Sequence, residues 1–181
     1  MKGIVFAEFI EFVEDTFSNS IADQMIDQSE LDSKGAYTSV GTYHHEEILE
    51  LVTNLARITD SQIPDLVRKF GKHLFGRLTS SYPSMLYGVD HCFDFLELIE
   101  NHIHVEVKKL YPDAELPHFD SERVSDTTLI LTYHSSRPFA QLALGLMEGS
   151  IEHFNEPIRI ETEGLEPSEN CAMRFTLHMD V

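Results

Sequence analysis

The chain has 181 residues, of which 42% are hydrophobic, and 13 basic against 31 acidic residues give it a formal net charge of −18. This length predicts one domain, residues 1–181, with a substantial core. The negative charge argues against nucleic-acid or anionic-membrane binding, because both require a basic surface. It suits a soluble protein that docks on a basic partner.

The two cysteines, Cys92 and Cys171, imply neither a disulfide framework nor a Cys-rich zinc site, which fits a reducing cytoplasm. Glu8 and Glu11 interrupt the apolar start of the chain, so it is not a signal peptide. No apolar run approaches the length needed to span a membrane. We therefore expect a cytoplasmic location.

Apolar residues at helical spacing dominate the first two-thirds of the chain. They predict helices over residues 3–18, 21–28, 44–58, 61–78 and 89–110. Asp60 or Ser61 is expected to cap the fourth helix, which has Pro64 in its first turn. The fifth helix is expected to end before Pro112.

After Pro117 the pattern changes to short apolar strands. Strands are expected over residues 118–123, 127–134, 157–163 and 171–180, with a helix over 138–154 between the two pairs. This β-β-α-β-β order predicts an antiparallel sheet. The fold class is therefore α+β, with a helical part over about 1–112 and a sheet-containing part over about 113–181.

One motif follows an apolar strand: Tyr133-x-Ser135-x-Arg137. In an extended strand, side chains at this spacing lie on one face. Two hydroxyls and a guanidinium on one side suit a small anionic group such as a carboxylate or phosphate. The spacing alone also fits an ordinary strand end with a surface arginine.

Two of the ten histidines, His102 and His104, lie late in the fifth predicted helix. On an α-helix they would point about 200° apart and could not bind one ion from a single face. They flank Ile103 on the expected buried stripe, which comprises Phe95, Leu98, Ile99, Ile103, Val107 and Leu110. Each, taken alone, also fits a core-edge histidine with a satisfied hydrogen bond.

Several features combine into a family resemblance. His104 is followed by Tyr111-Pro112, by Pro117 and by Tyr133-x-Ser135-x-Arg137, and the chain opens Met1-Lys2-Gly3-Ile4-Val5-Phe6. In this order and at these intervals they resemble the haem nitric oxide/oxygen binding (H-NOX) family. That family includes the haem domain of soluble guanylate cyclase and stand-alone bacterial gas sensors. The resemblance covers essentially the whole chain.

The resemblance implies haem b between the helical and sheet-containing parts. His104 would be the proximal iron ligand, leaving the other iron face open for a gas, with His102 as the alternative ligand. Pro117 would press on the porphyrin as a rigid wedge. The propionates would be held by Tyr133, Ser135 and Arg137.

The resemblance also addresses gas selectivity. Dioxygen-binding members carry a distal tyrosine five residues after the motif arginine, where this chain has Leu142. The expected distal wall is wholly apolar: Val5, Phe9, Leu74, Leu78, Leu142 and Leu146. A wall without a hydrogen-bond donor implies binding of nitric oxide and carbon monoxide and little binding of dioxygen.

In this family, nitric oxide weakens or breaks the iron–histidine bond, here to His104, which would let the haem relax against Pro117. We expect no output domain after residue 181, so the implied partner is a separate histidine kinase or cyclic-di-GMP enzyme. Some members carry a C-terminal zinc site, but here Cys171 is the one cysteine in that region, so no zinc is expected.

Two other function classes remain as alternatives. A peroxidase-type haem enzyme would need a distal acid–base group, which the expected wall does not provide, so we expect no enzyme activity. A haem-free binding module of similar fold would use the Tyr133-x-Ser135-x-Arg137 motif for another carboxylate or phosphate. An intense Soret absorption band would separate the haem protein from this module.

Overall fold

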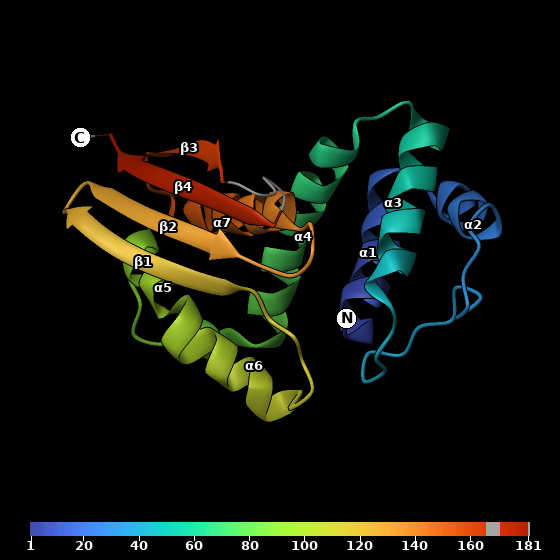
Figure 1. The fold of residues 1–181 in the computed structure, drawn as a ribbon, viewed down its shortest axis with the longest axis horizontal. Helices are drawn as coiled ribbons and strands as arrows, with labels where there is room; N and C mark the ends of the chain where they lie inside the picture. Colours follow the sequence, from blue (N-terminus) through green and yellow to red (C-terminus); the bar gives the residue numbers. More distant parts are fainter. Residues whose placement is uncertain (166–170, 181) are drawn as a thin grey trace.

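The computed structural model describes residues 1–165 and 171–180. Its helices are α1 (Gly3–Thr16), α2 (Asn19–Asp27), α3 (His45–Thr59), α4 (Ile63–Ser81), the 3-10 turn η1 (Pro83–Leu86), α5 (Cys92–Leu98), the π-helical segment η2 (Ile99–Ile103), α6 (His104–Leu110) and α7 (Ala140–Phe154). Its strands are β1 (His118–Ser125), β2 (Thr128–His134), β3 (Ile158–Gly164) and β4 (Ala172–Met179). In Figure 1, α1, α2 and α3 stand apart from the sheet, with α4 between the two groups.

The four strands form an antiparallel sheet in the order β1-β2-β4-β3. In β2, Leu129, Leu131 and Tyr133 alternate with more exposed residues, so one face of the strand is buried. Helices α5 and α7 pack on this face (Figure 1). The predicted α+β class and β-β-α-β-β order are confirmed. Residues 166–170 of the predicted loop between β3 and β4 lie outside the described part of the chain.

The buried side chains gather in two cores. The helical core lies among α1, α2, α3 and the first half of α4, and its members with no exposed surface are Phe6, Phe9, Val13, Met25, Leu51 and Leu55. The sheet core lies between the sheet and α5 and α7, and its members with no exposed surface are Cys92, Leu129, Leu131, Ala140, Phe175 and Leu177. Helix α4 contributes to both, through Leu66 at its start and Phe75 further along.

Helices α4 and α7 pack against each other at glycines. A Cβ atom built on Gly145 would lie 2.0 Å from the carbonyl oxygen of Arg68, and one on Gly71 would lie 2.4 Å from that of Leu142. Any larger residue at either position would therefore push the two backbones apart. Arg68 and Glu148 form an ion pair beside the contact, with 2.7 Å between Nε and Oε2.

The structure differs from the prediction about the start of α4. Gln62 precedes α4 without a side-chain capping bond, whereas Asp60 ends α3 in the left-handed conformation with φ of 51°. Neither Asp60 nor Ser61 caps α4, because the chain must first reverse after α3. Pro64 does lie in the first turn of α4, as predicted.

The predicted helix over residues 89–110 is in fact three segments: α5, η2 and α6. The π turn of η2 is wider than an α turn, so the residues after it face different directions from those expected for a continuous α-helix. Ile103 stays buried, but Leu110 is 57% exposed and does not belong to the buried stripe. Among the described residues, no helix combines the length and apolar character needed to cross a membrane.

Candidate functional site

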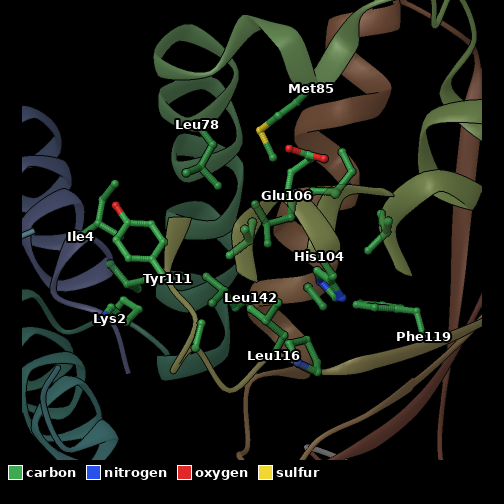
Figure 2. A pocket seen from close by; sticks show the side chains of 18 of the residues that line it. Lys2, Ile4, Leu78, Met85, His104, Glu106, Tyr111, Leu116, Phe119 and Leu142 are labelled. Atoms are coloured by element: carbon green, nitrogen blue, oxygen red, sulfur yellow. The ribbon is translucent and has the colours of Figure 1, made fainter. Parts of the chain in front are cut away.

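A cavity of about 880 Å³ lies between the start of α1, α4, the segments η2 and α6, the sheet and α7. Its size falls in the usual range for small-molecule and cofactor sites. Most of its lining is apolar, including Ile4, Val5, Phe75, Leu78, Met85, Leu116, Leu142 and Leu146. Figure 2 shows side chains from segments far apart in sequence pointing into it.

His104 is the first residue of α6 and lines the cavity (Figure 2). Its side chain is 15% exposed, and its Nδ1 lies 3.3 Å from Oε2 of Glu100. Burial lowers the pKa of the imidazole, although the charge of Glu100 acts in the opposite direction. A lowered pKa favours the neutral ring, which is the form that binds a metal.

Glu100 lies in η2 and accepts hydrogen bonds from β1 as well. Its Oε1 is 2.9 Å from Nδ1 of His118, and its Oε2 is 3.1 Å from the backbone nitrogen of Phe119. Burial would raise the pKa of this carboxyl, but the bonds from His118 and the Phe119 N–H outweigh it and lower the pKa. Glu100 is therefore a carboxylate that connects η2 and α6 with the first residues of β1.

Tyr133, Ser135 and Arg137 all line the cavity, as the motif predicts. The geometry is not the expected extended strand, because β2 ends at His134 and the chain then bends. The backbone N–H of Arg137 donates to Oγ of Ser135 over 3.0 Å, which fixes this bend. Tyr133 is 2% exposed, and burial raises the pKa of its hydroxyl.

The guanidinium of Arg137 is paired with Glu115, a carboxylate that is 71% exposed. The Arg137 side chain itself is 15% exposed. Because the carboxylate is exposed and the guanidinium is largely buried at the cavity, an anionic ligand group can replace the carboxylate in this ion pair. The motif therefore presents a fixed positive charge at the edge of an apolar cavity.

The other predicted site residues divide into two groups. Pro117, Val5, Leu78, Leu142 and Leu146 line the cavity, and so does His102, which is exposed. The predicted wall residues Phe9 and Leu74 are not among the lining residues; they are 0% and 4% exposed and belong to the helical core. Helices α1 and α4 turn Ile4 and Phe75 toward the cavity in their place.

Sequence reasoning missed Glu100, Met85 and Leu116, and it used Tyr111 for the family resemblance without placing it in the cavity. Glu100 alone carried a usable signal, since it precedes His104 by four residues and this spacing brings helical side chains together. The others come from turns and from the segment between α6 and β1, where no periodicity guides a prediction.

The donor set fits a haem. In the described part of the chain, no group of three or more His, Cys, Asp or Glu side chains is placed to hold a bare metal ion. The largely buried imidazole of His104 instead suits an iron that brings four ligands of its own, as a porphyrin provides. The positive charge of Arg137 at the cavity edge suits the propionates of such a group.

The chain matches the family model described as Haem-NO-binding over residues 2–162. It is 42% identical to the H-NOX protein from K. algicida, solved as Fe(II) unliganded, with a TM-score of 0.93 over 100% of this chain and 97% of that chain. It is 39% identical to the IWP-051-bound H-NOX from Shewanella woodyi in the Fe(II)CO state, with a TM-score of 0.84 over 99% and 95% of the two chains.

A third similar structure is an H-NOX protein from S. oneidensis in the Fe(II)NO state. It is 25% identical, with a TM-score of 0.91, and the match covers 100% of both chains. No curated protein matches the chain.

Proposed function

Because this chain belongs to the haem-NO-binding (H-NOX) family, we propose that it binds ferrous haem b through His104 and senses nitric oxide. Carbon monoxide also binds, and dioxygen is largely excluded. The chain has the fold of the haem-binding gas sensors of this family. The observation that carries the proposal is a largely buried imidazole that lines an apolar cavity of about 880 Å³ with a guanidinium at its edge.

His104 is the better of the two candidate iron ligands. Its side chain is 15% exposed and has a hydrogen-bond partner for Nδ1, whereas His102 is exposed. Arg137, Ser135 and Tyr133 would hold the propionates, with Glu115 displaced from the guanidinium. When bound, haem supplies an iron with one open face for a diatomic gas.

The gas preference rests on the four expected wall residues that line the cavity. The side chains of Val5, Leu78, Leu142 and Leu146 offer no hydrogen-bond donor, whereas the other lining residues include the hydroxyls of Thr79, Tyr82 and Tyr111. A polar dioxygen complex needs a donor, whereas nitric oxide on ferrous iron does not. Relatives solved in Fe(II)NO and Fe(II)CO states support the proposed ligands.

Signalling would begin at His104, by weakening or breaking of its bond to iron. The ring is tied through Glu100 to β1, and Pro117 lines the same cavity just before this strand. Movement of the ring therefore reaches the sheet. The proposed recipient is a separate histidine kinase or cyclic-di-GMP enzyme, and the formal charge of −18 would favour a basic docking surface.

The first test is the absorption spectrum of the reduced protein without gas, with nitric oxide and with air. We expect a five-coordinate ferrous Soret band that shifts with nitric oxide and gives no oxy complex. His104→Gly should lose the band and regain it with added imidazole, while His102→Gly should keep it. A colourless protein that cannot be reconstituted with haem would refute the proposal in favour of a haem-free module. In a separate metal analysis, we expect no stoichiometric zinc.

A second test addresses the exclusion of dioxygen. Leu142→Tyr places a hydroxyl in the cavity wall, so we expect an oxy spectrum in air. Leu142→Phe adds similar bulk without a donor and should give none. An oxy complex in the phenylalanine variant, or none in either, would show that a missing donor does not explain the selectivity.

A further inference from the structure

We propose that Glu100 is a positioning residue for His104. It holds the ring in one tautomer, strengthens the bond that Nε2 makes to iron, and ties the ring to the start of β1. The effect on iron rests on the haem site proposed above, whereas the effect on the tautomer does not.

The tautomer follows from the partners of the carboxylate. A carboxylate has no proton to donate, so the Nδ1 atom that faces Oε2 of Glu100 at 3.3 Å must carry the hydrogen. The lone pair of His104 then lies on Nε2. A carboxylate behind a ligating imidazole fixes its orientation and raises its basicity.

Glu100 is itself held in place by β1. His118 Nδ1 donates to Oε1 over 2.9 Å, and the Phe119 N–H donates to Oε2 over 3.1 Å. These two bonds are shorter than the 3.3 Å contact to His104. The carboxylate is therefore anchored mainly to the strand, and His104 is positioned relative to the strand rather than to α6 alone.

This connection leads onward to the anion-binding motif. The Phe119 ring lies 6.0 Å from the His104 ring and 5.4 Å from the Tyr133 ring, and Phe119 pairs with Tyr133 across β1 and β2. Glu100 and Phe119 thus join the proposed iron ligand to the first residue of the Tyr133-x-Ser135-x-Arg137 motif. A displacement of His104 has a direct route to both strands.

The local backbone explains why Glu100 can reach both partners. The N–H of His104 bonds to the carbonyl of Ile99, five residues back, which is the π-helical pattern. This wider turn places Glu100 between α6 and the first residues of β1. Single π turns of this kind are frequent at functional sites.

The first measurement uses the protein without haem. Nitrogen-15 NMR of the histidine side chains should show His104 as the Nδ1–H tautomer, and Glu100→Ala should shift it toward Nε2–H. Glu97→Gln is the control: this carboxylate of α5 pairs with Arg123 at 3.5 Å and does not contact His104. An unchanged His104 tautomer in Glu100→Ala would overturn the inference, whatever the haem content.

The second measurement is resonance Raman spectroscopy of the reduced haem protein. The iron–histidine stretching frequency should fall from wild type to Glu100→Gln and again to Glu100→Ala, while Glu97→Gln keeps the wild-type value. Haem transfer to an acceptor protein should become about 10-fold faster in Glu100→Ala. This is the low end of the loss in metal affinity that follows when a hydrogen-bond partner of a metal ligand is removed. Glu100→Gln keeps the side-chain size, so it serves if the alanine variant does not fold.

The outcomes separate this inference from the proposed function. A Soret band with the same iron–histidine frequency in all four proteins would refute the role of Glu100 and leave the sensor proposal intact. Failure of the wild-type protein to bind haem would refute the sensor proposal, while the NMR measurement would still decide the tautomer.

Discussion

The helical core and the sheet core differ in what they contribute to the cavity. The sheet core and the segments packed on it supply the lining residues His104 and Arg137, together with Glu100, which contacts His104. These residues carry the proposed chemistry. The helices that form the helical core supply mainly apolar surface near the start of α1, such as Ile4 and Val5. One region therefore holds the ligand groups, and the other closes the cavity.

Aromatic ring pairs also stabilise the helical core. The Phe6 ring stacks on Tyr37 with 4.4 Å between centroids, and Phe9 meets Phe70 edge-on at 5.0 Å. Aromatic pairs of this kind add about 0.5–1.5 kcal/mol each beyond area burial. These pairs hold α1 against the segment around Tyr37 and against α4.

The largest expected effect tests whether the two cores are separable. Leu51→Ala in the helical core and Leu131→Ala in the sheet core each remove a fully buried side chain. Each should lower the free energy of unfolding by about 3 kcal/mol. Hydrogen exchange should then accelerate chiefly in α1 and α3 for the first variant, and chiefly in β2 and β4 for the second. Equal acceleration everywhere would mean that the two cores open as one unit.

The second prediction concerns the α4–α7 contact. Gly145→Ala would place a Cβ atom 2.0 Å from the Arg68 carbonyl oxygen, so the helices must separate. We expect a loss of about 2 kcal/mol in urea denaturation, in the range of overpacked cores. The matched control is Gly76→Ala, also in α4, where nothing lies within 4 Å. It should stabilise by about 0.5 kcal/mol through helix propensity. A neutral Gly145→Ala would show that the contact tolerates separation.

Much of this fold was predictable because its signals are local. Helical spacing identified α1, α3, α4 and α7, and the alternation of Leu129, Leu131 and Tyr133 identified β2 and its buried face. The π turn before His104 was not predictable. Over five residues, an apolar pattern does not distinguish a π turn from an α turn, and the difference depends on what packs against the segment.

The residues of the site were also predictable only where the sequence carries a local signal. His104 and Arg137, which motif spacing singles out, both line the cavity. Phe9 was expected in the cavity wall, but Ile4 lines the cavity instead. Helix α1 is apolar on several sides, because it packs against the helical core and also lines the cavity. Periodicity gives the stripe of such a helix but not which edge faces the ligand.

The smallest expected effect concerns the contacts that join the two regions at the rim of the cavity. Asp113, between α6 and β1, accepts from Lys2 Nζ at 3.1 Å and from Thr42 Oγ1 at 2.9 Å. The hydrogen bond from Lys2, followed by the one from Thr42, lowers the pKa of Asp113. A carboxyl with a lowered pKa stabilises the fold while it is ionised, so this contribution is present above its ordinary pKa of about 4 and is lost as the pH falls below it.

Asp113→Asn should therefore loosen the start of α1 at pH 7, seen as faster exchange of the Gly3 and Ile4 amides, which donate to Gly41 and Ser39. The difference in stability from wild type should shrink as the pH falls from 4 toward 2. Asp126→Asn, in the turn between β1 and β2, makes the same charge change away from the cavity and should leave those amides unaffected. If the difference from wild type persists unchanged at pH 2, the carboxylate charge is not what joins the two regions, and the packing of Lys2 on the Tyr111 ring, at 5.4 Å from its centroid, becomes the better explanation.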